Sequence, residues 1–393
     1  MQLSILKAAA LAVALQTTSA SPLRRIGGVK VVETTTTAHG QIVDWVVPES
    51  QTGGDIAQAP PVPPSPPSKR GINAMQATIR ALLNDPATQG PNGTVPIPRS
   101  SGTTKTIKRL PTKEDHESLA QVNAADDSYA GKHWYANSGQ NVDNKGGRAT
   151  FSLFKAFTQN NADFSLLQTA VYRNNAPHSG TGAVTQTVEA GWINTLSQAS
   201  EPHLFSYFTT NGYSAEGDNL GGWNRDHAGW VQVDSQIYPG VAFAPLSVDG
   251  GAQSELEIGY YLSGGNWWLW CLDRYIGYYP GSMFSQGVNA ADTLADHANG
   301  INFYGEIFNS GDAMTTTDMG SGEFPDAGLG KSAYMHNIQY VDTSDGYQDY
   351  NGQDQLSVDD AARYNLISSW NSGSSWGSFM YLGGPGAGGQ INA

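Results

Sequence analysis

The chain has 393 residues, of which 14% are charged, and its formal net charge is −14. Residues 1–129 carry 12 basic and 10 acidic groups, whereas residues 130–393 carry 9 basic and 25 acidic groups. The acidic excess would repel phosphates, which argues against nucleic acid as a partner of this later part. The excess suits a protein that works at low pH, where carboxylates are protonated, and equally suits a surface that only aids solubility.

The first 20 residues, MQLSILKAAALAVALQTTSA, have the pattern of a secretory signal peptide. Lys7 precedes an apolar run, and a small-residue cleavage site follows at Thr18-Ser19-Ala20. The run is too short to span a membrane, and no later segment is apolar for long enough. We therefore expect a secreted, extracellular protein that has no membrane partner.

Residues 21–128 are expected to form a pro-region and not one compact domain. The stretch IAQAPPVPPSPPSKR is a proline-rich linker that ends at the dibasic pair Lys69-Arg70, where we expect a processing protease to cut. Residues 72–85, INAMQATIRALLND, have the apolar spacing of a helix. Processing by the protein itself, at a proline in the linker or near Pro111, is a second route. The charge asymmetry predicts that this region docks electrostatically on the acidic part and that acid weakens the contact.

Residues 129–393 are expected to form one domain, because short strand-like segments with aromatic alternation follow one another between turns. No regular helix is expected there, which favours an all-β, antiparallel β-sandwich of two packed sheets over βαβ units. Ser263-Gly264-Gly265-Asn266 is predicted to be a hairpin loop. The predicted strand segments are RATFSLFKAF, DFSLLQTAVYR, QTVEAGWIN, HLFSYFTT, GWVQVD, SELEIGYYL, NWWLWCLDRYIGYY, INFYGEIF, YMHNIQYVD and GSFMYL.

Metal sites and covalent catalysis find no support in the sequence. The eight histidines are scattered without metal-ligand spacing, so no metal and no cofactor is expected. There is no G-x-S-x-G motif of the serine hydrolases. The single cysteine, Cys271, lies among tryptophans and is expected to be a buried, inert thiol.

Two glutamates lie inside predicted strands: Glu189 in QTVEAGWIN and Glu306 in INFYGEIFNS. Strand alternation places Tyr304, Glu306 and Phe308 on one face, where aromatic neighbours would desolvate the carboxyl group and raise its pKa. Two such carboxyl groups close together titrate separately, so that one serves as base and the other keeps its proton. On pattern alone, most strand glutamates face solvent. Three further glutamates have similar local surroundings: Glu255, Glu257 and Glu323.

Several longer segments carry a resemblance to a known family. In chain order they are VEAGWIN, EPHLFSYFTTNGY, SGGNWWLW, IGYYPGSMF, INFYGEI, TTTDMGSGEFPDAGLGKSAYMHNIQYVD and YLGGPGAGG. Together they look like the neprosin catalytic domain, which defines a family of secreted, proline-directed glutamic peptidases best known from plants. The likeness runs from about residue 130 to about residue 388.

The resemblance implies a sandwich with a groove across one face, made as a precursor with its own pro-region as inhibitor. It implies that the catalytic pair is Glu189 and Glu306, and that an activated water attacks the peptide carbonyl. Which glutamate is base and which is acid stays open. The cysteine pairs of the plant members are absent here, so the preference for proline could be relaxed.

Aromatic side chains suit the rigid ring of a proline-containing peptide or protein substrate. Trp192, Tyr207 and Tyr278 are the candidates for such a pocket, although packing in a core is the commoner use of these residue types.

Two alternatives to a peptidase remain open on the sequence. A secreted glycoside hydrolase also combines a β-sandwich, exposed aromatic side chains and a glutamate pair. A non-catalytic carbohydrate-binding module would instead use Trp267, Trp268 and Trp270 as a stacking platform.

Overall fold

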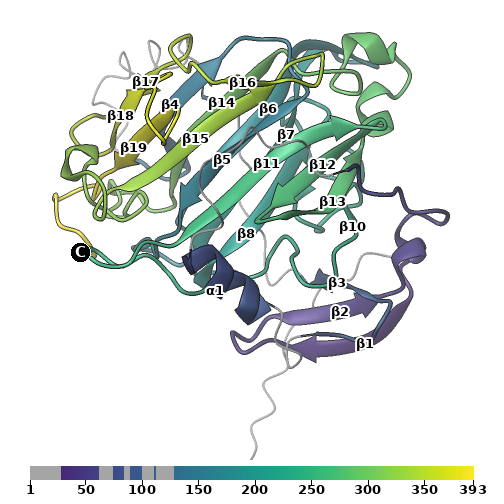
Figure 1. The fold of residues 1–393 in the computed structure, drawn as a ribbon, viewed down its shortest axis with the longest axis horizontal. Helices are drawn as coiled ribbons and strands as arrows, with labels where there is room; N and C mark the ends of the chain where they lie inside the picture. Colours follow the sequence, from purple (N-terminus) through teal and green to yellow (C-terminus); the bar gives the residue numbers. More distant parts are fainter. Residues whose placement is uncertain (1–27, 62–73, 84–88, 100–109, 112–127) are drawn as a thin grey trace, which may run out of the picture.

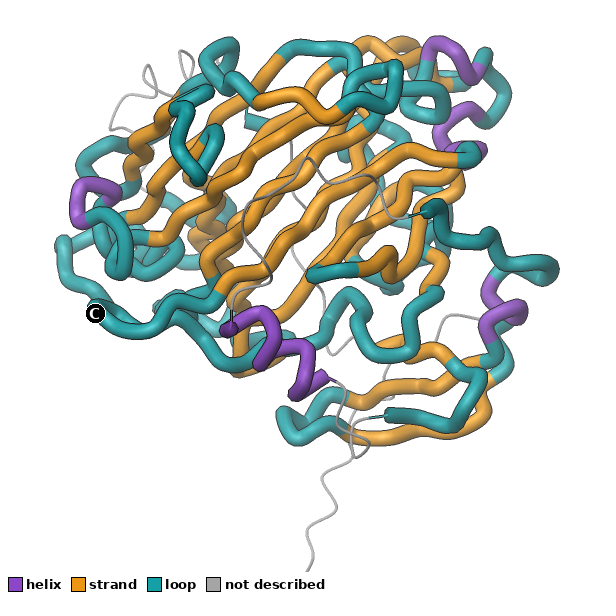
Figure 2. The backbone as a smooth tube through the Cα atoms, viewed as in Figure 1, coloured by secondary structure: helices purple, strands orange, loops and turns teal. Residues whose placement is uncertain are grey.

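The fold is a computed structural model that describes residues 28–61, 74–83, 89–99, 110–111 and 128–393 (Figures 1 and 2). The predicted signal peptide and the dibasic pair Lys69-Arg70 lie outside the described residues. Within the described part of the chain, no helix is long and apolar enough to cross a membrane.

Two large antiparallel sheets make up the main body. The seven-stranded sheet has the order β17 (Ser357–Val358), β4 (Lys132–Gln140), β14 (Gly300–Asn309), β6 (Phe164–His178), β7 (Gly182–Thr195), β8 (Ala199–Thr209) and β9 (Gly221–Trp223). The nine-stranded sheet has the order β10 (Val231–Gln232), β13 (Arg274–Pro280), β12 (Asn266–Cys271), β11 (Glu255–Ser263), β5 (Gly146–Ser152), β15 (Ala333–Val341), β19 (Phe379–Gly383) and β18 (Asn365–Ser369), with β16 (Tyr347–Asp349) paired to β15.

The remaining regular elements are short. A small sheet has the order β1 (Val31–Thr36), β2 (Ile42–Val46) and β3 (Val95–Pro98), and helix α1 spans Ala74–Leu83. The 3-10 helices are η1 (Pro48–Gln51), η3 (Gly281–Ser285), η4 (Ala290–Asp292) and η5 (Pro325–Ala327).

The two large sheets pack face to face, and strand alternation decides which side chains fill the space between them (Figure 1). On β6, Leu167 and Val171 belong to the large core cluster, which also holds Phe151 and Ile258 of the opposite sheet. The side chains of residues 166, 168 and 170 alternate with these and point to the outward face of the seven-stranded sheet. The predicted all-β, antiparallel β-sandwich is confirmed.

The hairpin predicted at residues 263–266 is confirmed: Ser263 pairs with Asn266, and Gly264 and Gly265 have positive φ angles of 57° and 74°. Glycine is favoured at both positions because this two-residue turn needs left-handed backbone. The segment NWWLWCLDRYIGYY, in contrast, is two strands, β12 and β13, which turn at Leu272 with φ 61°. Cys271 at this turn is buried and free, and burial raises the pKa of its thiol.

The N-terminal region contains more structure than its sequence predicts. The helix lies within the predicted range 72–85, but the three strands β1, β2 and β3 were not predicted. The segment VVETTT of β1 has only half-buried and exposed side chains, so it shows no apolar alternation. Among the strands of the main body, the prediction missed β4, β9, β16, β17 and β18.

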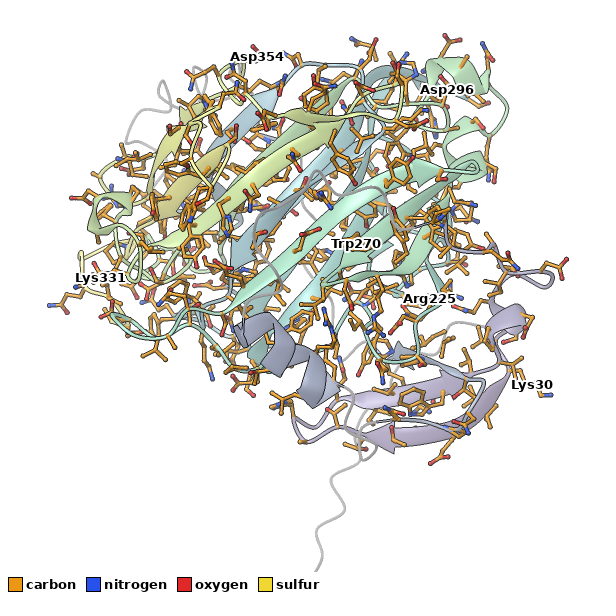
Figure 3. All side chains as sticks on the ribbon, viewed as in Figure 1. Lys30, Arg225, Trp270, Asp296, Lys331 and Asp354 are labelled. Atoms are coloured by element: carbon orange, nitrogen blue, oxygen red, sulfur yellow. The ribbon has the colours of Figure 1, made fainter. Side chains whose placement is uncertain are left out.

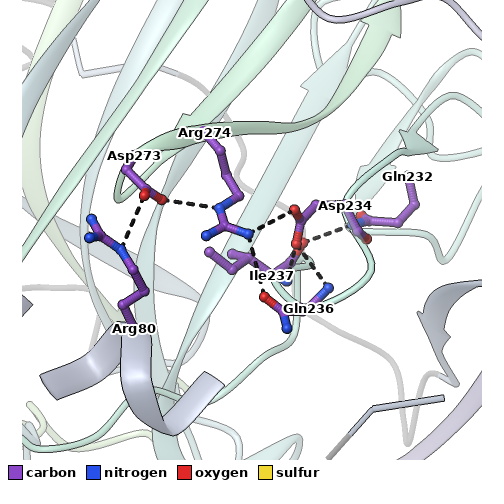
Figure 4. A network of polar contacts seen from close by, with 7 residues as sticks. All are labelled: Arg80, Gln232, Asp234, Gln236, Ile237, Asp273 and Arg274. Carbon is purple, nitrogen blue, oxygen red and sulfur yellow. Dashed lines mark hydrogen bonds and ion pairs between the residues drawn. The ribbon is translucent and has the colours of Figure 1, made fainter. Parts of the chain in front are cut away.

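The N-terminal region packs against the sandwich mainly through apolar side chains. Trp45 of β2 and Ile79 of α1 belong to the same core cluster as the interior of the sandwich. An ion pair joins Arg80 of α1 to Asp273 at 3.1 Å, within the polar network of Figure 4. Among the described residues this contact is mainly apolar, and buried apolar groups do not respond to acid as carboxylates do. The electrostatic docking that the charge asymmetry predicts stays a prediction, because many of the basic residues of this region lie outside the described part of the chain.

Candidate active site

Glu189 and Glu306 lie on the same face of the seven-stranded sheet, on strands that flank β6. Glu189 of β7 pairs with Ala170, and Glu306 of β14 pairs with Leu166. Residues 166 and 170 are an even number apart, so both carboxylates project to one side. That side is the outward face, because Leu166 and Ala170 pack in clusters separate from the core between the sheets. The glutamates thus form a pair, arranged diagonally across β6.

Glu189 is fully buried and is held by hydroxyl groups. Its Oε1 accepts hydrogen bonds from Tyr213 Oη at 2.6 Å and Thr187 Oγ1 at 2.7 Å, and its Oε2 accepts one from Tyr304 Oη at 3.4 Å. Burial raises the pKa of Glu189 to about 7; the hydrogen bonds from Tyr213 and Thr187 oppose this rise, and the charge of Glu306 adds to it. Glu189 therefore keeps its proton in weakly acidic solution.

Glu306 is also fully buried, but its main partner is a histidine. Its Oε1 contacts His133 Nδ1 and accepts a hydrogen bond from Tyr135 Oη at 3.3 Å. Its Oε2 has no hydrogen-bond partner among the described residues. The His133 ring packs against Phe308, with ring centroids 4.9 Å apart. Glu306 thus has a neighbour that can carry positive charge and stabilise an ionised carboxylate.

Two tyrosines connect the glutamates. Tyr135 donates to Glu306 and Tyr304 donates to Glu189, and their ring centroids are 5.9 Å apart. Burial and the neighbouring carboxylates raise the pKa values of both tyrosines, so both hydroxyl groups keep their protons. The two carboxyl groups therefore have different surroundings: Glu189 is held by hydroxyl groups, and Glu306 contacts a histidine.

A segment of the N-terminal region lies on the same face as the glutamate pair. Leu110 is buried in a cluster with Tyr135 and Tyr304. The carbonyl oxygen of Pro111 accepts hydrogen bonds from the side-chain amides of Asn137 and Asn302, each at 3.4 Å. The chain therefore places a Leu-Pro peptide of its own beside the two carboxylates.

Of the three predicted pocket residues, the structure brings only Tyr207 next to a glutamate. Tyr207 pairs with Glu189 from β8 and stacks on Tyr213, with ring centroids 6.0 Å apart. The expectations for Trp192 and Tyr278 are wrong, as both residues lie away from this face.

Trp192 is three residues from Glu189, so strand alternation turns it to the opposite face, into the core between the sheets. There its Nε1 donates to the carbonyl oxygen of Ser152 on the other sheet at 2.8 Å. Tyr278 lies on the nine-stranded sheet in a cluster with Trp268 and Trp270, the latter labelled in Figure 3. Neither side chain can line a pocket above the glutamate pair.

The sequence reasoning missed most of the partners of the glutamates. His133 and Tyr135 lie on the missed strand β4, whose sequence KHWYANSGQ shows no clear apolar alternation. Tyr213 lies in a loop with φ 60°, a conformation that no local pattern around it predicts. Tyr304 was found, because it is two residues from Glu306 on the same strand.

Comparison with known proteins places the chain in a family. Two crystal structures of scytalido-glutamic peptidase, each with a transition-state analogue, match 65% and 66% of this chain and 98% and 99% of theirs. The identities are 7% and 6%, and the TM-scores are 0.30 and 0.31. A sequence profile of the Neprosin family matches residues 161–385, more than half of the chain. The protein therefore belongs to the Neprosin family, a family of glutamic peptidases.

Proposed function

We propose that the protein is a secreted glutamic endopeptidase that cleaves after proline at acid pH and is made as a zymogen. The observation that carries the proposal is the pair of buried carboxylates on one sheet face, with different partners and with a Leu-Pro segment beside them. A family of peptidases supplies the reaction class. The signal-peptide pattern of residues 1–20 supports an extracellular location.

In this mechanism Glu306 is the general base and Glu189 the general acid. Glu306 takes a proton from a water molecule, whose oxygen forms a bond to the carbonyl carbon of the substrate. The carbonyl oxygen gains negative charge and receives the proton of Glu189. When the C–N bond breaks, the proton held by Glu306 passes to the leaving nitrogen, and Glu189 regains its proton as the carbonyl reforms.

The preference for proline rests on the Leu110-Pro111 segment. A proline residue has no N–H to satisfy, so a proline-containing peptide can lie on this face without leaving a donor unpaired. The amides of Asn137 and Asn302, which hold the carbonyl oxygen of Pro111 in the docked segment, can hold a backbone carbonyl oxygen of the substrate outside the scissile bond. We propose that a substrate takes the place of this segment, and that the N-terminal region keeps the protein inactive by holding the segment there.

The decisive experiment compares peptides that differ in one residue. The purified, processed protein is incubated at acid and at neutral pH with a peptide that contains one proline and with its alanine counterpart. Cleavage after proline, faster at acid pH, is expected. Cleavage of both peptides at equal rates contradicts the proline preference, and cleavage of neither contradicts the proposal as a whole.

The carbohydrate-binding alternative loses its predicted platform. Trp267 points into the core and donates its Nε1 hydrogen to the carbonyl oxygen of Leu294 at 2.7 Å, whereas Trp268 and Trp270 point outward. The three tryptophans therefore do not form one surface. A polysaccharide panel tests the remaining glycoside hydrolase alternative, because sugar release would favour it.

A further inference from the structure

The centre of the site holds a polar side chain that the two-glutamate scheme does not use. Gln168 lies on β6, opposite Gly191 of β7 and Tyr304 of β14. Glu189 on β7 pairs with residue 170, two positions after Gln168. Glu306 on β14 pairs with residue 166, two positions before Gln168, so the two glutamates are diagonal neighbours of Gln168 on opposite sides. Such diagonal neighbours have Cα atoms roughly 7–8 Å apart, within reach of long side chains.

The side chain of Gln168 points to the outward face, because residues 166 and 170 of the same strand do so. It is fully buried, and neither its amide nitrogen nor its amide oxygen has a hydrogen-bond partner among the described residues. Such an unsatisfied group is unfavourable in a folded protein and is rarely kept without a function.

The residue of β7 that pairs with Gln168 is Gly191, so no side chain from that position fills the space beside the Gln168 amide. A Cβ atom at Gly191 would lie 1.9 Å from the carbonyl oxygen of Leu167, so the close approach of β6 requires glycine there. The neighbouring hydroxyl groups already have acceptors, since Tyr213 and Tyr304 donate to Glu189. Among the described residues of the site, the N–H groups of Gln168 lie between the two glutamates without an acceptor, whereas the other such buried nitrogen, His133 Nε2, lies beside Glu306 alone.

We propose that Gln168 is a third catalytic residue, whose Nε2 donates a hydrogen bond to the carbonyl oxygen of the scissile peptide bond. This inference rests on the proposed function. When the water oxygen bonds to the carbonyl carbon, the π electrons of the carbonyl move to its oxygen, and the amide stabilises that charge while Glu189 delivers its proton. An amide donor keeps its hydrogens at every working pH, so it can stabilise the charge of the carbonyl oxygen throughout the working range.

The test uses the processed enzyme and two neighbouring residues of β6. Gln168→Leu removes the donor at similar volume and is expected to lower kcat by about 10²–10³-fold with little change in KM. The affinity for a peptide with a phosphinic group, which mimics the tetrahedral intermediate, should fall in parallel. Thr169→Val is the matched control, because Thr169 is also buried without a hydrogen-bond partner among the described residues but points into the core.

A second variant separates chemistry from packing. Gln168→Glu keeps the shape of the side chain but donates a hydrogen bond only while its carboxyl group is protonated. We expect it to retain activity at acid pH and to lose it at a lower pH than the wild type does. A packing role would not move the pH profile in this way.

Three outcomes would overturn the inference. If Glu189→Gln and Glu306→Gln are inactive but Gln168→Leu keeps kcat within about threefold of wild type, the inference fails and the proposed function stands. If Thr169→Val loses as much activity as Gln168→Leu, the effect comes from strand packing. If the wild-type enzyme cleaves no peptide, the inference and the proposed function fail together.

Discussion

Each of the two large sheets carries a pair of glutamates beside tyrosine side chains on its outward face, and the two pairs have different partners. On the nine-stranded sheet, Glu255 contacts His336 Nε2 at 3.1 Å and accepts a hydrogen bond from Tyr334 at 2.9 Å, while Glu257 forms an ion pair with Arg148 at 3.0 Å. Their side chains are 13% and 28% exposed. Those of the other pair are fully buried and come from strands on either side of β6.

The difference teaches that a glutamate between aromatic side chains in a strand does not by itself mark a catalytic group. Burial raises the pKa of Glu257 too, but Arg148, which stays protonated, opposes the rise. Glu189 has only hydroxyl donors, which do not balance its charge. Below about pH 7, the protonated form of Glu189 is therefore the more stable one.

The largest expected effect separates the two pairs directly. Glu189→Gln or Glu306→Gln should lower kcat/KM for a proline-containing peptide by at least about 10²–10⁴-fold, because either change removes one of the two proton-transfer groups. Glu255→Gln and Glu257→Gln should keep kcat/KM within a few-fold, since neither residue lies on that face. A loss of similar size in all four variants would contradict the assignment.

The next effect concerns the N-terminal segments that pack on the outward faces of the two sheets: Leu110-Pro111 on the seven-stranded sheet and Ile56 on the nine-stranded sheet. Leu110→Ala leaves a cavity beside Tyr135 and Tyr304 and should weaken the docking of its segment by about 2–4 kcal/mol. In a Glu306→Gln background, where self-cleavage is blocked, a fluorescent proline-containing peptide should then bind at least about tenfold more tightly.

Ile56→Ala is the control for this prediction, because Ile56 packs on the cluster of Trp268 and Tyr278 on the other sheet. It should leave peptide affinity unchanged. Equal peptide affinities for Leu110→Ala and the unmodified background would show that the Leu110-Pro111 segment does not block the site.

A third effect is the pH dependence of stability. The pKa of Glu189 is about 7 in the folded protein and about 4.3 when unfolded, so the folded state binds this proton more tightly. The stabilisation is complete below about pH 4.3 and is lost as pH rises through 7, by about 4 kcal/mol. Urea unfolding at several pH values measures the free energy of unfolding. Its decrease between about pH 4.3 and 7 should be present in the wild type and smaller by this amount in Glu189→Gln. Glu257→Gln should reduce it less, because Arg148 offsets the burial of that carboxylate.

The smallest effect is a shift in the pH dependence of kcat. The hydrogen bond from Tyr213 favours the ionised form of Glu189, so Tyr213→Phe should raise the pKa of Glu189 and move the alkaline limb of kcat upward by about one pH unit. Tyr334→Phe removes the matching hydroxyl beside Glu255 and should leave the profile in place. An upward shift of the acid limb in place of the alkaline limb for Tyr213→Phe would mean that Glu189 acts in its ionised form.

The sequence predicted the sandwich and the strands of both glutamates because apolar and aromatic alternation is a local signal. Alternation also separates Trp192 from Glu189, since three residues along a strand reverse the face, and this was overlooked. The partners of the glutamates depend on pairing between distant segments: His133 reaches Glu306 only because β4 lies beside β14. The Leu110-Pro111 segment belongs to no strand or helix, so no periodicity could reveal where it docks.

The place of β14 in its sheet has a consequence for the order in which the protein is made. β14 inserts between β4 and β6, although more than a hundred residues separate it from both along the chain. Pairing over such sequence distances forms late in folding. The ribosome delivers β1–β3 and Leu110 long before Glu306. During synthesis, the segment that docks beside the glutamate pair is therefore present before the second carboxylate of the pair has been made.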